Sequence, residues 1–254
     1  MNPWKKKLIE VLLEQGLEEQ LARGMILSGK ILVNGKRETR TGAFIRSDDS
    51  VLIPEPKKYV SRSALKLLGG LDDFGVSIEN KICMDLGSST GGFVQVLLEK
   101  GAKRVYAVDV GYGILDYSLR KNEKVTVLER CNVRNISASW FLPEDFEEIK
   151  KRKCFFVSCD ISFMSIRTVL SSLVAFLSEE KIFCEGVLLL KPQFEDSRNT
   201  EKGILADESL RRKIVDDSVK YLESIGAECR GVRPSKIKGA SGNQEYLISI
   251  FFSG

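Results

Sequence analysis

Histidine is absent from this chain of 254 residues. Mechanisms that need an imidazole base, such as Ser-His-Asp and Cys-His catalysis, are therefore excluded. Any proton transfer must use Asp, Glu, Lys, Tyr or Cys side chains. The six cysteines are scattered and form no C-x-x-C pair. This pattern predicts reduced cysteines in a cytosolic protein and no zinc or other metal site.

Long apolar segments are absent as well. No apolar run approaches the roughly 18 residues of a membrane-spanning helix, and the opening stretch MNPWKKKLIE lacks the apolar core of a secretory signal. We therefore expect a cytoplasmic protein that has no membrane partner.

The net charge is +4, and residues 1–58 hold 11 Lys/Arg against 8 Asp/Glu. Such a basic excess suits a polyanionic partner, although a solvated charged face would have the same composition.

The first 58 residues predict a small α+β unit. The spacing of apolar residues predicts helices over 5–15 and 18–28. The stretch GKILVNGK predicts a short strand with a tight turn at Asn34 and Gly35, and DDSVLIPEP predicts a closing strand. The two prolines of PEPKK indicate a linker over residues 55–58.

Strands and helices alternate from residue 59 onward. Strands are predicted over residues 81–86, 104–110, 125–129, 154–160, 185–191, 227–233 and 245–252. Helices are predicted over residues 62–74, 91–100, 113–121, 142–151, 165–178 and 207–225. This alternation is typical of an α/β fold with a mostly parallel sheet and helices on both faces. Ligands in such sheets bind at the carboxyl ends of the strands.

The stretch ICMDLGSSTGGF, residues 82–93, predicts a strand, a glycine-rich turn and the start of a helix. Its G-x-x-x-G-G spacing differs from the G-x-G-x-x-G of dinucleotide sites. The carboxylate of Asp85, two residues before the first glycine, would repel a pyrophosphate but suit a positive amine. Asp109 ends the next strand, where an acid accepts hydrogen bonds from ribose hydroxyls. A ligand that carries both an amine and a ribose fits S-adenosylmethionine. A turn in which the glycines serve only tight packing stays open as a structural alternative.

Asp160 and Cys159 end the fourth predicted strand, in FFVSCDISF. Many amino-group methylases carry Asp/Asn-Pro-Pro-aromatic at this point, whereas this chain has D-I-S-F, which disfavours methylation of an exocyclic amine. A cysteine nucleophile could support carbon-5 methylation of a pyrimidine. Alternation along the strand, however, aims Cys159 and Asp160 at opposite faces. We therefore expect Cys159 to be a buried core residue.

Three more candidates belong to the same edge of the sheet. Lys191 closes the apolar strand VLLLK, Lys66 lies on the helix of SRSALKLL, and Glu245 begins the strand EYLISIFF. Each of these residues, taken alone, could equally have a structural or a functional role. Together with Asp160 they gather two amines and two carboxylates, in which each lysine lowers the pKa of the other. A neutral lysine could then take a proton from a ribose hydroxyl for in-line attack on a sulfonium methyl group.

Several of these stretches resemble one known family. The similarity lies in YVSRSALKL, CMDLGSSTGGF, VYAVDVGYGIL, VLERCNVR, CDISFMSI, LLLKPQFE and GNQEYL, within residues 59–252. They are similar to the hemolysin A-like (TlyA) ribosomal RNA methyltransferases of the FtsJ-type ribose 2′-O-methyltransferase superfamily. The resemblance implies a Rossmann-like fold with a mixed seven-stranded sheet and S-adenosylmethionine as cofactor. It also implies ribosomal RNA or ribosomal subunits as partner, with cytidine as the methylated nucleoside.

The same resemblance implies residue roles. The family's K-D-K-E catalytic tetrad corresponds to Lys66, Asp160, Lys191 and Glu245, with Lys191 as the base. The cofactor-binding positions are Asp85, Gly87, Ser88, Ser89, Gly91, Gly92, Asp109, Val110 and Asn132. Among them Asn132 would lie beside the adenine and Asp109 would hold the ribose.

The N-terminal segment, residues 1–54, resembles the alpha-L RNA-binding domain found in small-subunit ribosomal protein four, best in GKILVNGK. Such a domain would dock basic residues on RNA phosphates. The chain departs from the family at residues 7–9, which read K-L-I where relatives have R-L-D, and at Glu19 and Ala206, where relatives have Arg. A membrane-active hemolysin and a non-catalytic RNA-binding assembly factor stay open as alternative functions of the protein. The glycine spacing argues against an NAD enzyme.

Overall fold

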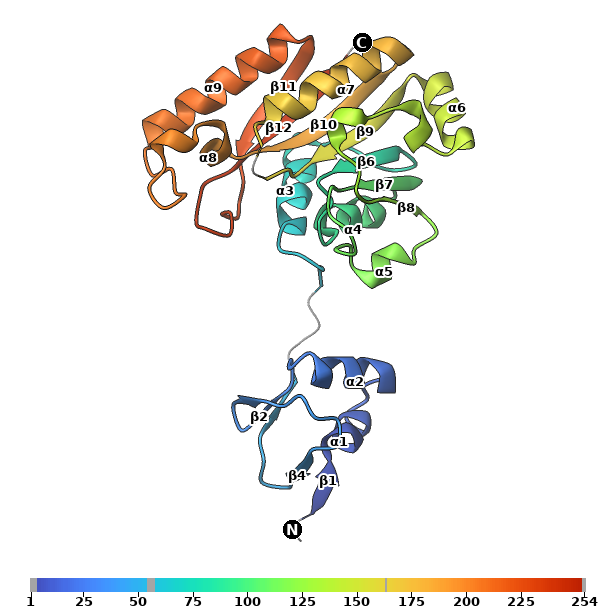
Figure 1. The fold of residues 1–254 in the computed structure, drawn as a ribbon, viewed down its shortest axis with the longest axis vertical. Coiled ribbons are helices and arrows are strands. Elements are labelled where there is room, and N and C mark those ends of the chain that lie inside the picture. Colours follow the sequence, from blue (N-terminus) through green and yellow to red (C-terminus); the bar gives the residue numbers. More distant parts are fainter. Residues whose placement is uncertain (1–3, 54–57, 163, 253–254) are drawn as a thin grey trace. The chain divides into compact units, whose positions relative to one another are not determined.

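The computed structural model describes residues 4–53, 58–162 and 164–252. The chain divides into two compact units, residues 1–58 and 59–254 (Figure 1). The predicted linker, residues 55–58, lies outside the described residues except for Lys58. Each unit is built around its own apolar core.

The N-terminal unit combines two helices with short antiparallel strands. Helices α1 (Leu8–Glu14) and α2 (Glu19–Leu27) are accompanied by β1 (Lys5–Lys7), β2 (Leu32–Val33), β3 (Lys36–Arg37), β4 (Phe44–Arg46) and β5 (Val51–Leu52). Strand β2 pairs with β3 across the Asn34–Gly35 turn, and both turn residues have the positive φ that such hairpins need. The helix predicted from residue 5 begins only at Leu8, because the three preceding lysines pair with β4.

The larger unit contains a seven-stranded mixed sheet. Its strands are β6 (Ile82–Leu86), β7 (Arg104–Val108), β8 (Val125–Leu128), β9 (Cys154–Cys159), β10 (Phe183–Leu190), β11 (Ala227–Pro234) and β12 (Tyr246–Phe252), in the order β11-β12-β10-β9-β6-β7-β8. The five strands from β10 to β8 are parallel. Strand β12 runs antiparallel to both of its neighbours. The predicted fold class, with its mixed sheet, is confirmed.

Helices cover both faces of this sheet (Figure 1). One face packs against α3 (Ala64–Phe74), α4 (Gly92–Glu99) and α5 (Tyr117–Arg120), and the other against α6 (Pro143–Arg152), α7 (Ile166–Glu180) and α9 (Glu208–Ser224). A short helix, α8 (Pro192–Glu195), follows β10, and single 3-10 turns lie at η1 (Val133–Asn135), η2 (Ala138–Trp140) and η3 (Ser197–Asn199). The helix predicted over 113–121 is shorter, because the side chain of Asp116 accepts the amide of Ser118 and caps α5 there.

The central strands are buried on both faces, which explains their nearly continuous apolar sequence. Along β6, Met84 packs in the core beneath α7 and Cys83 in the core beneath α4. The alternation places successive side chains on opposite faces of the sheet.

One buried hydroxyl ties the sheet to α6. Tyr106 on β7 is fully buried, and its hydroxyl donates to Asp145 Oδ2 at 2.6 Å and accepts from the amide of Leu142 at 2.9 Å. Both partners lie at the start of α6. Losing the hydroxyl would leave a buried carboxylate and a partly buried amide with one partner fewer.

We therefore expect Tyr106→Phe to lower the free energy of unfolding by about 1–3 kcal/mol. Tyr221→Phe is the control, because the hydroxyl of Tyr221 makes a 3.2 Å bond to a carbonyl in an exposed setting. Urea unfolding followed by circular dichroism measures both variants. Equal stability of the two variants would contradict this role of Tyr106.

Candidate active site

The four residues of the predicted tetrad lie around one edge of the large sheet. Asp160 follows β9, Lys191 follows β10, and Glu245 directly precedes β12. In the antiparallel pair of β10 and β12, Leu190 is opposite Tyr246. One further step in this register brings Lys191 opposite Glu245. Lys66 reaches the same edge from the first turn of α3.

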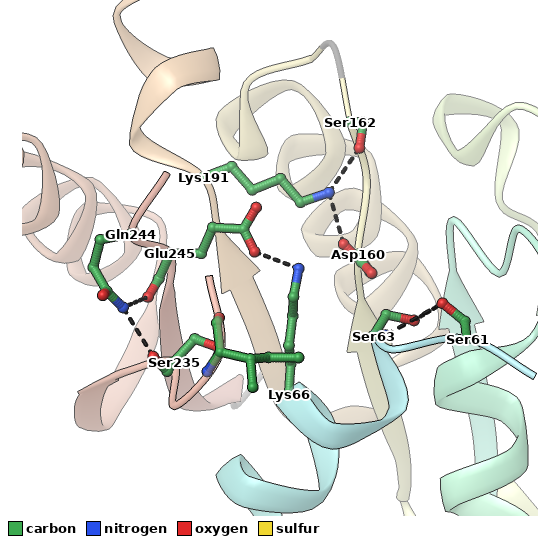
Figure 2. A network of polar contacts seen from close by, with 10 residues as sticks. Ser61, Ser63, Lys66, Asp160, Ser162, Lys191, Ser235, Gln244 and Glu245 are labelled. Carbon is green, nitrogen blue, oxygen red and sulfur yellow. Dashed lines mark hydrogen bonds and ion pairs between the residues drawn. The ribbon is translucent and has the colours of Figure 1, made fainter. Parts of the chain in front are cut away.

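The four side chains form two ion pairs (Figure 2). Lys66 Nζ lies 2.5 Å from Glu245 Oε2, and Lys191 Nζ lies 2.7 Å from Asp160 Oδ1. The carboxylate of Glu245 lies between the two lysine side chains in Figure 2. The exposed fraction of each lysine side chain is at most 10%. Two cations and two anions therefore share a site that is largely shielded from solvent. Each amine in it has a carboxylate at hydrogen-bonding distance.

Neighbouring groups fix these side chains. Lys191 Nζ also donates to Ser162 Oγ at 2.7 Å. Gln244 Nε2 donates to the carbonyls of Ser235 and Glu245, both at 2.9 Å. A Cβ at Gly239 would lie 2.5 Å from Glu245 Oε1, so only glycine lets the main chain approach this carboxylate.

Sequence reasoning missed these supporting residues. Ser162 stands two positions after Asp160 within D-I-S-F, and nothing in the sequence indicates that its hydroxyl would bond to Lys191. Phe163 of the same stretch lies outside the described residues. Gly239 and Gln244 carry no signal in one sequence, because their contacts depend on how the segment before β12 folds back.

The glycine-rich turn packs directly against the tetrad. Gly87 has φ +85°, and a Cβ there would come within 3.0 Å of the carbonyl oxygen of Asp160. The amides of Gly87 and Ser88 both donate to the carbonyl of Val108. Gly91 and Gly92 then lead into α4. A side chain at Gly87 would therefore collide with the segment that follows β9.

Asp85 lies within β6, and Asp160 and Asp109 directly follow the adjacent strands β9 and β7. Asp85 is fully buried, and burial raises its pKa to about 8, with a further rise from the charges of Asp160 and Asp109. Ser158 Oγ donates to Asp85 Oδ1 at 2.7 Å, which opposes that rise. Asp85 Oδ2 is buried with no hydrogen-bond partner within the described residues. A cation bound near this turn would stabilise the ionised carboxylate.

The remaining predicted cofactor residues follow β7 and β8. Asp109 accepts the amide of Ser89 at 2.8 Å and that of Gly111 at 2.7 Å, one on each carboxylate oxygen. Each oxygen retains a further acceptor site, which suits a pair of hydroxyls. Val110 is 67% exposed. Asn132 Oδ1 accepts the amide of Arg134 at 3.0 Å and caps η1.

Cys159 is a core residue, as expected. Its exposed fraction is 2%, and burial raises the pKa of its thiol to about 12. The thiolate needed for nucleophilic attack is therefore strongly disfavoured at neutral pH. Across the part of the chain that is described, no group of three or more Cys, Asp or Glu side chains could hold a metal ion.

The buried Lys66–Glu245 pair predicts a measurable stability effect. Glu245→Gln leaves the Lys66 ammonium without its counter-ion, which should lower the free energy of unfolding by about 3–5 kcal/mol. The double variant Lys66→Met/Glu245→Gln should recover part of this loss. Asp72→Asn, which breaks the more exposed pair with Lys100, should cost at most about 1 kcal/mol. Denaturant unfolding that finds equal losses for Glu245→Gln and Asp72→Asn would contradict the buried pairing.

Asp85 predicts a pH dependence of stability. Because its folded pKa of about 8 exceeds its usual value of 3.8, the folded protein binds this proton more tightly than the unfolded chain. Stability should therefore fall as pH rises from about 4 to about 8, by up to about 1.4 kcal/mol per pH unit. Asp85→Asn should remove this slope, whereas Asp72→Asn should retain it. Unfolding free energies at pH 5, 6, 7 and 8 measure the slope, and parallel curves for wild type and Asp85→Asn would refute it.

Comparison with known proteins identifies the family to which the chain belongs. The profile of the FtsJ-like methyltransferases matches residues 59–252. A Bacillus subtilis protein, YqxC, whose name proposes an rRNA methyltransferase, is 36% identical over 100% of this chain and 88% of its own length. The Mycobacterium tuberculosis 16S/23S rRNA (cytidine-2′-O)-methyltransferase TlyA is 35% identical over 93% of this chain and 86% of its own length.

A solved structure is similar over both units of the chain. A Streptococcus thermophilus protein that carries a hemolysin name is 33% identical, covers 98% of this chain and 89% of its own length, and has a TM-score of 0.68. Among the described helices, none is both long enough and apolar enough to cross a membrane. The match over residues 59–252 and the identities of 35–36% over almost the whole length establish that the chain belongs to the FtsJ-like methyltransferase family.

Proposed function

We propose that this protein is an S-adenosylmethionine-dependent methyltransferase that modifies a ribose 2′-hydroxyl of ribosomal RNA, with cytidine as the target. The observation that carries the proposal is the pair of buried lysines, each with a carboxylate within 2.7 Å. The name of the Mycobacterium tuberculosis relative supports the same reaction, substrate and nucleoside. The action on ribosomal RNA would take place in the cytoplasm.

The cofactor site fits a ligand with positive charges. S-adenosylmethionine supplies an electrophilic methyl group on a sulfonium, together with an ammonium group and a ribose. The orphaned Oδ2 of buried Asp85 and the carboxyl groups on the adjacent strands favour such cations. Asp109 would bind the ribose hydroxyls, and Val110 and Asn132 would lie beside the adenine. The turn from Gly87 to Gly92 would let the main chain approach the cofactor.

Lys191 would act as the general base once its ammonium group has released a proton. Its Nζ would take the proton of the 2′-hydroxyl while the oxygen attacks the methyl carbon and the carbon–sulfur bond breaks toward sulfur. Asp160, 2.7 Å away, would stabilise the ammonium ion that results. Ser162 would hold the amine in place through the bond that it accepts.

Lys66 and Glu245 would position the substrate. The ion pair at 2.5 Å fixes the Lys66 amine, which would donate a hydrogen bond to the attacking ribose oxygen. The absence of histidine leaves lysine as the amine base of the site, and the buried thiol of Cys159 disfavours carbon-5 methylation. The basic N-terminal unit would add contacts to RNA phosphates.

We expect Lys191→Ala to reduce methyl transfer by about 10²–10⁴-fold, the usual contribution of a general base. Binding of S-adenosylmethionine should persist, because the cofactor would contact the turn and Asp109. Transfer of labelled methyl groups to ribosomal subunits and calorimetry with the cofactor measure the two properties.

Lys220→Ala, which removes an exposed lysine on α9, is the matched control and should behave as wild type. Wild-type turnover in Lys191→Ala would refute the role of the base. Failure of the wild-type protein to bind S-adenosylmethionine would favour the non-catalytic assembly factor.

A further inference from the structure

A hollow of about 610 Å³ lies beside the start of β12, where residues on either side of Glu245 line it. Its walls come from residues 204–206, the first turns of α9 and the segment 234–246. Its volume falls within the range of small-molecule sites and is large enough for one nucleotide. No residue of the predicted cofactor site lines it.

The walls are tied together by a buried side chain. Asn243 is 4% exposed. Its Oδ1 accepts the amide of Leu205 at 2.9 Å, and its Nδ2 donates to the carbonyl of Gly203 at 2.8 Å. These bonds join the segment before α9 to the segment before β12, so the hollow is held open by a specific contact.

The lining is basic. Arg211, Arg212 and Lys238 line the hollow against one acid, Glu208. Arg212 pairs with Glu208 at 2.5 Å. Neither Arg211 nor Lys238 has an ion-pair partner in the part of the chain that is described. The hollow thus has a surplus of positive charge that suits a phosphate.

Arg211 is held in place while part of its guanidinium group remains available. Its Nη1 donates to the carbonyl of Leu205 at 2.8 Å and to that of Ala206 at 2.5 Å. Its Nε has no acceptor among the residues described but is buried, so a phosphate in the hollow would contact the terminal Nη groups instead. Guanidinium has five N–H donors, so the two carbonyls leave others unused. Ala206, where the family has Arg, adds no charge of its own to this wall.

The hollow lies one residue from the tetrad. Gln244 and Tyr246 line it, and Glu245 between them pairs with Lys66. Side chains alternate along extended chain, so the two lining residues face away from Glu245. Ile204, Pro234 and Tyr246 supply apolar surface beside the basic groups. A base or sugar could rest on this surface while its phosphate meets the arginine and lysine.

We propose that this hollow binds the nucleotide of the RNA strand that flanks the methylated ribose, with Arg211 and Lys238 contacting its phosphate. The inference rests on the proposed ribose methylation and extends it to the substrate. The strand enters the tetrad across the start of β12, and the bound neighbour holds the target ribose against Lys191.

Lys238→Glu tests the contact, because Lys238 is exposed and its replacement leaves the walls intact. Lys213→Glu is the matched control, since Lys213 is an exposed lysine of α9 that does not line the hollow. The probe is deproteinised bacterial ribosomal RNA. Filter binding over a range of salt concentrations, KM for RNA, kcat, and cofactor affinity by calorimetry are measured for each protein.

Lys238→Glu should raise KM and the dissociation constant for RNA about five- to twentyfold and reduce the salt slope by about one. Cofactor affinity and kcat at saturating RNA should match those of Lys213→Glu. If both variants methylate with the same KM and salt slope, the hollow does not bind RNA, although the proposed function stands. If wild type transfers no methyl group, the proposed function fails, and RNA binding alone then tests the hollow. Weaker RNA binding by Lys238→Glu than by Lys213→Glu would support the hollow as an RNA site. Equal RNA binding by the two variants would overturn it.

Discussion

The antiparallel return of β12 beside β10 is the constraint on which the candidate site depends. Its register places Leu190 opposite Tyr246 and thereby brings Lys191 and Glu245 to the same edge. A slip by one residue would turn the side chains of β12 to the opposite face and remove Glu245 from Lys66. The ladder of backbone hydrogen bonds and the apolar side chains of both strands therefore determine where the charges meet.

The buried charges of the site make the free energy of folding less favourable. Burying an ion pair rarely gains stability over an apolar substitute, because both ions lose hydration. Here two lysines, two paired carboxylates and the buried Asp85 lie together, and Asp85 has a pKa raised to about 8. Such an arrangement is typical of sites whose electrostatics serve chemistry. The neighbouring hollow, lined by Arg211, Arg212 and Lys238, adds positive charge beside the start of β12.

Much of the fold could be predicted from one sequence, but the contacts within the site could not. Alternating apolar runs located all seven strands of the large sheet, and the polar residues that end those runs pointed to Asp160 and Lys191. The pairing of Lys66 with Glu245 spans 179 positions, and no local pattern reports it. Gly239 supports Glu245 through main-chain packing that follows from the loop conformation. The late starts of α1 and α5 have a similar cause, since strand pairing and an Asp116 cap override apolar spacing.

The position of the transferred methyl group is the most direct measure of this account. Ribosomal subunits are incubated with the protein and isotopically labelled S-adenosylmethionine, the RNA is digested to nucleosides, and these are resolved by mass spectrometry. The account predicts label on a 2′-O-methylated nucleoside, with cytidine as the modified residue. Label on a base carbon or base nitrogen, or no transfer by a protein that binds the cofactor, would contradict it.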